Sequence, residues 1–98
     1  MRERMVERHL VERLRQIGVP CVKFVPDHMK GMPDRLILLP DEKVIWCELK
    51  TDGGRLEPIQ EVRHMALRKA GQRVEIVWSP AEADKLIEEI KSAYQIGV

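Results

Sequence analysis

The sequence predicts a small α/β domain in which a mixed β-sheet is flanked by helices, and three observations carry that prediction. The 98 residues are 44% hydrophobic and 34% charged, a composition typical of a folded chain with one modest core. Segments with helical periodicity and short apolar runs follow one another in the order α-β-β-β-α-β-α. No repeat, low-complexity tract or linker interrupts them, so we expect a single domain over residues 1–98.

The first helix is predicted over residues 3–17, where apolar side chains recur at helical spacing and Gly18 follows the end. This apolar stripe consists of Val6, Leu10, Leu14 and Ile17, with Val11 at its edge. A short strand is expected over residues 21–25, and a loop with two prolines follows over residues 26–33.

Two strands joined by a tight turn come next. Residues 36–39 form a continuous apolar run, which predicts a strand over residues 35–39 that is buried on both faces. A turn over residues 40–43 leads into a third strand over residues 44–50. Strands joined by so short a turn pair antiparallel as a hairpin.

The second half of the chain repeats the alternation after a loop over residues 51–57. A helix is predicted over residues 58–70, with proline in its first turn and Gly71 past its end. A strand over residues 73–78 follows, and the capping-box signature of residues 79–82 opens a last helix that ends near Ala93.

Composition excludes several classes of protein. No apolar run approaches the ~20 residues that span a bilayer, and the charged N-terminus does not resemble a signal peptide, so we expect no membrane association. Cys21 and Cys47 lie among apolar residues and are expected to be free thiols. The net charge is +1, but residues 1–35 carry eight Lys or Arg against five Asp or Glu, so the first third is basic.

The third strand carries the first candidate for chemistry. Glu48 and Lys50 are two residues apart, so both side chains lie on one face of the strand. A carboxylate there can bind a hard metal ion beside a cation that stabilises charge on a phosphate. An ordinary surface ion pair is the alternative interpretation of this pattern.

Asp34 provides a second carboxylate, because it stands at the start of the strand that pairs with the strand of Glu48. The hairpin therefore brings Asp34 and Glu48 together. Two carboxylates so close repel each other unless a cation lies between them, and a divalent metal ion is the natural occupant.

The first helix offers a third acid. On a helical wheel Glu7 falls inside the apolar arc, where an unpaired carboxylate is costly, while Glu12 falls on the opposite face. Glu7 is therefore the favoured functional candidate, although a pairing with an arginine would also explain its place. Glu3 lies within the arc too, at the start of the helix, so Glu3 and Glu12 stay open as alternatives.

Taken in order, these residues resemble a known nuclease pattern. Gly31-x-Pro33-Asp34 precedes Glu48-x-Lys50, and Gln60 follows in the next helix. This set is similar to the PD-(D/E)xK nuclease superfamily and, more narrowly, to the VRR-NUC family in the short, stand-alone form carried by phages and bacteria. The resemblance covers nearly the whole chain and implies a small restriction-endonuclease-like fold.

The resemblance also implies roles for individual residues. Asp34 and Glu48 would bind the metal ion, joined by the backbone carbonyl of Leu49, and Lys50 would be the catalytic lysine. Glu7 would support the metal site from the first helix, and Gln60 would lie near the active centre. For DNA contacts we expect Lys30, Arg35, Arg55 and His28, which flank the proposed site.

The implied activity is hydrolysis of DNA phosphodiester bonds with Mg²⁺ or Mn²⁺. Stand-alone members of the family resemble Holliday junction resolvases, which implies a homodimer acting on branched DNA in the cytoplasm of a bacterial or phage-infected cell. A catalytically silent DNA-binding module and a sequence-specific nuclease of the restriction type are the alternatives.

Overall fold

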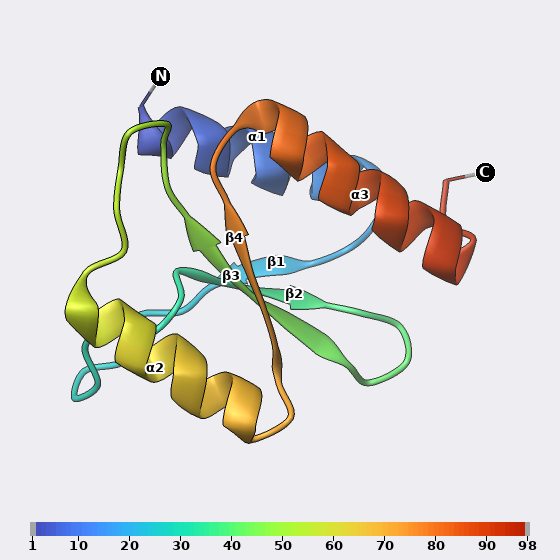
Figure 1. Cartoon of the computed structure of the whole chain (residues 1–98). Helices are drawn as coiled ribbons and strands as arrows, with labels where there is room; N and C mark the ends of the chain where they lie inside the picture. The colour runs from blue at the N-terminus through green and yellow to red at the C-terminus, as the bar shows by residue number, and fades with distance from the viewer. Residues whose placement is uncertain (1, 98) are drawn as a thin grey trace.

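A computed structural model describes residues 2–97, and its elements follow the predicted order (Figure 1). The bounds are α1 Glu3–Gln16, β1 Cys21–Lys23, β2 Arg35–Leu38, β3 Val44–Leu49, α2 Pro58–Lys69, β4 Arg73–Val77 and α3 Pro80–Tyr94. The α/β class and the order of elements predicted from the sequence are confirmed.

The four strands form one mixed sheet in the order β1-β2-β3-β4. β1 pairs antiparallel with β2, and β2 pairs antiparallel with β3 in a register that sets Arg35 opposite Cys47 and Leu38 opposite Val44. β4 lies parallel to β3, because α2 carries the chain back across the sheet before β4 begins. The predicted hairpin is therefore present, and its turn contains Glu42 at a φ of 71°.

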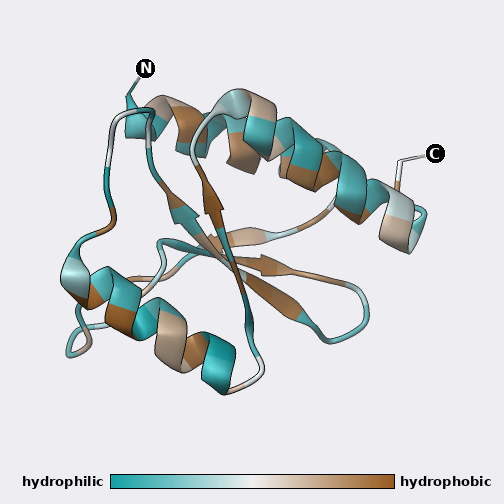
Figure 2. Ribbon diagram, in the orientation of Figure 1, coloured by the Kyte–Doolittle hydropathy of each residue, from teal (hydrophilic) through white to brown (hydrophobic). Residues whose placement is uncertain are grey.

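Helices cover both faces of the sheet. α1 and α3 pack side by side on one face, and α2 lies on the other (Figure 1). The main core is on the α1–α3 side, where Leu10, Ile45 and Ile87 are fully buried. In Figure 2 the central strands are largely brown, while α1 and α3 alternate between brown and teal, as expected for amphipathic helices on a sheet.

Local sequence signals determine where the last two helices begin. Pro58 opens α2 and Pro80 opens α3, each at a position where the missing backbone N–H costs no helical hydrogen bond. Ser79 Oγ accepts a hydrogen bond from the backbone N–H of Glu82 at 3.2 Å, as the capping box predicts. The returning Glu82 carboxylate accepts from the N–H of Trp78, one residue earlier than that motif requires.

One expectation about the strands is wrong. β2 is not buried on both faces, because Leu38 is 37% exposed while Ile37 is fully buried. Ile37 points to the α1–α3 core, whereas Leu38 is on the α2 side, and the turn end of the hairpin extends away from α2 (Figure 1). The first strand is also shorter than predicted, since β1 ends at Lys23 and Val25 is exposed.

Two further expectations concern the chain as a whole. Cys21 and Cys47 are free thiols, and burial raises the pKa of Cys21 to about 11. Among residues 2–97, no helix has the length and apolar character needed to cross a membrane.

Candidate active site

The hairpin brings Asp34 and Glu48 to one end of the sheet, as the sequence predicts. Asp34 directly precedes β2, and its Oδ2 accepts a hydrogen bond from the backbone N–H of Leu49 at 2.9 Å. This bond anchors the Asp34 carboxylate to β3 beside Glu48. Its position is therefore set by strand pairing rather than by a mobile loop.

Glu48 is buried, with 1% of its surface exposed, and α2 supplies its partners. Gln60 Nε2 donates a hydrogen bond to Glu48 Oε2 at 3.3 Å, and His64 Nε2 lies 3.2 Å from Glu48 Oε1. Gln60 Oε1 also accepts from the backbone N–H of Glu57 at 2.8 Å, so the start of α2 fixes the orientation of this amide. One helix thus holds both oxygens of the buried carboxylate.

The electrostatics of the pair favour a bound cation. Burial, hydrogen bonding to Asp34 and the charge of Asp34 raise the pKa of Glu48 to about 9, while the positive charge of Lys50 opposes the shift. Lys50 is half-buried at the end of β3. A divalent cation between the two carboxylates would stabilise the ionised form of both, so this end of the sheet suits a hard metal ion.

His64 is a residue of this site that the sequence reasoning missed. It is 1% exposed, and burial lowers its pKa, so the ring is neutral near pH 7. In the Nε2–H tautomer the ring donates to Glu48, and Nδ1 is left buried without a hydrogen-bond partner. The available signal was the spacing of four residues between Gln60 and His64, which puts both side chains on one face of α2.

The first-helix acids have different surroundings. Glu7 forms an ion pair with Arg35, whose Nε lies 2.8 Å from Glu7 Oε2, and Arg35 also donates to the carbonyl of Cys21 at 3.1 Å. This arginine pairing is the alternative that the sequence left open. Glu12 pairs with Arg15 at 3.0 Å.

Glu3 is the first-helix acid that is coupled to the site. Desolvation and then the negative charge of Asp34 raise its pKa, and the charge of Lys50 acts in the opposite direction. Glu3 in turn contributes to the raised pKa of Glu48, whereas Glu7 is not among the causes of that shift.

The loop before Asp34 is fastened to α2. Gly31 has a φ of 85°, and a Cβ atom there would lie 2.7 Å from the backbone oxygen of Ile59. Arg63 Nε donates to the carbonyl of Lys30 at 2.8 Å. α2 therefore fixes the position of the loop before Asp34 as well as that of the Glu48 carboxylate.

The predicted DNA-contact residues fall into two groups. His28, Lys30 and Arg55 are exposed in the two loops next to the site. Arg35 is half-buried, and its guanidinium group already binds the Glu7 carboxylate and the Cys21 carbonyl. It therefore links β2 to α1 and β1, in addition to adding positive charge near the site.

Side chains alone do not form a complete metal shell. Within residues 2–97, no three His, Cys, Asp or Glu side chains converge in an arrangement suited to a metal ion. Asp34 and Glu48 provide two carboxylates, and the remaining donors would be backbone carbonyls, water and substrate phosphate. This donor set fits Mg²⁺, which keeps several waters and uses one or two carboxylates plus phosphate oxygens.

Comparisons with known proteins agree with this geometry. No protein-family model matches the chain. It is 40% identical over 74 residues to "Putative nuclease p44" of Acyrthosiphon pisum secondary endosymbiont phage 1, which covers 76% of this chain and 80% of that protein. A solved structure described as a VRR_NUC domain superposes with a TM-score of 0.81 at 32% identity, over 88% of this chain and 94% of that one.

The chain belongs to the VRR-NUC family. The resemblance based on Gly31-x-Pro33-Asp34, Glu48-x-Lys50 and Gln60 is thereby confirmed at the level of family and fold. In this VRR-NUC domain the motif residues come from the loop before β2, from the end of β3 with the residue after it, and from α2, which meet at one end of the sheet.

Proposed function

We propose that this VRR-NUC domain is a metal-dependent endonuclease that hydrolyses DNA phosphodiester bonds. The observation that carries the proposal is the pairing of the Asp34 and Glu48 carboxylates beside the cationic Lys50. Burial and the neighbouring Asp34 raise the pKa of Glu48 to about 9. Burying Glu48 beside Asp34 lowers the stability of the fold, and a bound cation would offset this cost by stabilising both ionised carboxylates.

Mg²⁺ or Mn²⁺ would be held by Asp34 and Glu48, with the backbone carbonyl of Leu49 as a further donor. When bound, the ion supplies Lewis-acid stabilisation of the negative charge that builds up on the phosphate during hydrolysis. Asp34 is kept in place by the N–H of Leu49, so the donor set is organised before the ion arrives.

Lys50 contributes a fixed positive charge next to the two carboxylates. Within the part of the chain that the structure describes, Lys50 forms no salt bridge, so its ammonium is available to a phosphate oxygen or an attacking water. Charge develops on the phosphate in the transition state, and a pre-positioned cation stabilises that state more than the ground state.

Gln60 and His64 position Glu48 from α2. Their two hydrogen bonds restrict the carboxylate to one orientation, because both side chains come from the same helix. Gln60 therefore acts through Glu48, as does His64. For the first-helix acid we propose Glu3, because the charges of Asp34 and Lys50 influence its pKa, whereas Glu7 is committed to Arg35.

Branched DNA is the proposed substrate and a homodimer the proposed working form. One domain carries one such site, and the symmetrical resolution of a four-way junction needs two cuts. A dimer with twofold symmetry provides two equivalent sites. This part of the proposal is supported by the resemblance of stand-alone VRR-NUC proteins to Holliday junction resolvases.

The test is cleavage of end-labelled four-way junction, flap and linear duplex DNA with Mg²⁺, Mn²⁺ or EDTA. We expect wild-type protein to cut the junction only with metal, and Lys50→Ala to lose about 10²–10³-fold in rate. Lys43→Ala is the matched control, because it removes an exposed lysine at the other end of the same strand. Binding without cleavage under either metal would contradict the proposal and favour a silent DNA-binding module.

The same assay separates the first-helix acids. Glu3→Gln should slow cleavage without changing the midpoint of urea unfolding. Glu7→Gln should instead lower the stability by about 1 kcal/mol, because it leaves the half-buried Arg35 without its anion. The reverse result would return the metal-supporting role to Glu7.

A further inference from the structure

α1 presents a ridge of arginines on the side that faces away from α3. Arg4, Arg8 and Arg15 fall within about 40° of one another on a helical wheel, so they form one line along the helix. All three are exposed. The α3 side of the same helix is marked by His9 and Arg13, which both bond to Asp84.

Beside this ridge the surface is hollowed into a furrow. One hollow of ≈ 230 Å³ is lined by Arg4, Glu7, Arg8, Val11, Glu12 and Arg35. A second of ≈ 330 Å³ is lined by Val11, Arg15, Gly18, Val19, Pro20 and Cys21. Because Val11 lines both, the two hollows are neighbours along α1, next to the edge of the sheet, and we term them together the α1 furrow.

The charge of the α1 furrow is positive, because its acids are already neutralised. Glu7 is paired with Arg35 at 2.8 Å, and Glu12 is paired with Arg15 at 3.0 Å. Among residues 2–97, neither Arg4 nor Arg8 forms a salt bridge. Two unpaired guanidinium groups thus remain to bind an anion, and they recognise phosphate through paired N–H donors.

One end of the α1 furrow lies at the candidate active site. Arg4 follows Glu3, whose pKa is influenced by Asp34 and Lys50. Arg35, which lines the furrow, follows Asp34 in the chain and lies on the α1 side of the sheet at the same end, where it pairs with Glu7. The ridge from Arg4 to Arg15 is about 16 Å long at 1.5 Å per residue. One DNA strand carries about five phosphates over that length, at about 3.4 Å per phosphate along the helix axis.

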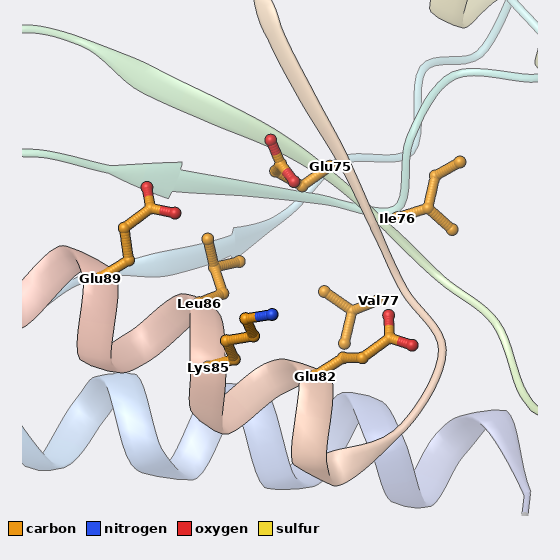
Figure 3. Close-up of a pocket in the computed structure, with 7 residues that line it drawn as sticks. All are labelled: Glu75, Ile76, Val77, Glu82, Lys85, Leu86 and Glu89. Atoms are coloured by element: carbon orange, nitrogen blue, oxygen red, sulfur yellow. The ribbon is translucent and has the colours of Figure 1, made fainter.

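The opposite flank of the molecule has the reverse charge. A hollow of ≈ 400 Å³ between β4 and α3 is lined by Glu75, Glu82 and Glu89 together with Lys85 (Figure 3). Arg73 pairs with two of these acids, with Glu75 at 3.0 Å and with Glu89 at 2.6 Å. Three carboxylates against two cations leave this flank with a net negative charge, which disfavours a phosphate there. DNA that reaches the active site is therefore favoured along α1 rather than along α3.

We propose that the α1 furrow binds the sugar-phosphate backbone of the DNA arm next to the cleaved bond, with Arg4 and Arg8 as the phosphate contacts. This proposal rests on the proposed nuclease function, because that function puts the cleaved bond at Asp34 and Glu48. These contacts are independent of base sequence, as expected for an enzyme that recognises DNA by its shape.

The test is fluorescence anisotropy of labelled four-way junction and duplex DNA in EDTA, so that binding is measured without cleavage. Arg4→Gln/Arg8→Gln is compared with Lys69→Gln/Lys85→Gln, which removes two exposed helical cations outside the α1 furrow. We expect the arginine variant to bind about tenfold more weakly. Between 50 and 200 mM salt, the slope of log K against log salt should be smaller in magnitude by about 2 for this variant than for wild type. Each lost phosphate contact reduces that slope by about 0.9. Arg4→Lys/Arg8→Lys should keep the wild-type slope, which separates lost charge from lost folding.

Two results would overturn the proposal. One is an arginine variant whose affinity and salt dependence match those of the lysine control. Another is unchanged DNA binding with loss of self-association in gel filtration, which would assign the α1 furrow to contact between copies. Cleavage with Mg²⁺ is measured in parallel. If wild-type protein binds through the arginines but cuts no substrate, the nuclease proposal fails while the furrow's role in DNA binding stands.

Discussion

The two faces of β3 differ in what they contribute. One face belongs to the core that stabilises the fold, and the other carries residues of the candidate active site. Ile45, Cys47 and Leu49 point toward α1 and α3 and belong to the apolar core. Glu48 and Lys50, on the α2 side, belong to the candidate site, where Glu48 is held by polar side chains. Successive residues of a strand alternate between faces, so one strand can serve both purposes without placing a charge in the main core. The two properties should therefore be separable by substitution.

The largest effect on stability is expected on the core face. Ile45→Ala removes a fully buried side chain and should lower the free energy of unfolding by about 2–5 kcal/mol. The cleavage rate per folded molecule should stay unchanged, because the α2 side of the strand is untouched. Urea unfolding combined with cleavage at low temperature measures both quantities. A parallel loss of rate in fully folded protein would show that the two faces are coupled.

On the site face, His64 allows a matched pair of substitutions. His64→Leu fills the same space without a donor and should reduce cleavage about 10–100-fold, whereas His64→Gln keeps a donor near Glu48 and should recover most of the rate. Calorimetric titration with Mn²⁺ gives a second readout, since only the leucine variant should lose affinity. Equal behaviour of the two variants would reduce His64 to a packing role.

The smallest expected effect, taken per pH unit, is a pH dependence of stability that originates at Glu48. The pKa of this carboxyl is about 9 in the folded protein against 4.5 for an unperturbed glutamate, so between these values the folded state holds a proton that the unfolded state has released. The stability of metal-free protein should therefore fall as pH rises, by at most about 1.4 kcal/mol per pH unit.

Glu48→Gln should abolish this slope between about pH 6.5 and 7.5. His64 has a lowered pKa and costs stability only below that window, and the cysteine thiols of the unfolded chain ionise above it. Urea unfolding in EDTA at several pH values measures the difference between wild type and variant. Identical slopes would mean that Glu48 is ionised in the metal-free protein.

The sequence predicted those features that depend on short-range pattern. The alternation along residues 44–50 and the turn at residues 40–43 were sufficient to bring Asp34 beside Glu48, because a hairpin has few possible registers. The capping signals likewise gave the ends of α2 and α3. These are contacts whose partners are near in sequence or fixed by strand pairing.

Contacts between distant elements were harder to predict. The helical wheel correctly turned Glu7 inward, but its partner Arg35 comes from β2, and no local pattern specifies that pairing. No sequence pattern assigns a role to His64, because its partner is Glu48 on the sheet that α2 covers. The exposure of Leu38 depends on where α2 ends over the hairpin, which is a property of the packed structure.

Gly31 has a consequence for how mutational scans of this protein should be interpreted. Its positive φ and the 2.7 Å clearance to the Ile59 backbone leave no room for any side chain, so every substitution should displace the loop that precedes Asp34. In saturation mutagenesis this position should score as intolerant as a metal ligand, although a glycine has no side chain to react. The score would measure clearance between two backbones, and a catalytic role inferred from intolerance alone would be mistaken.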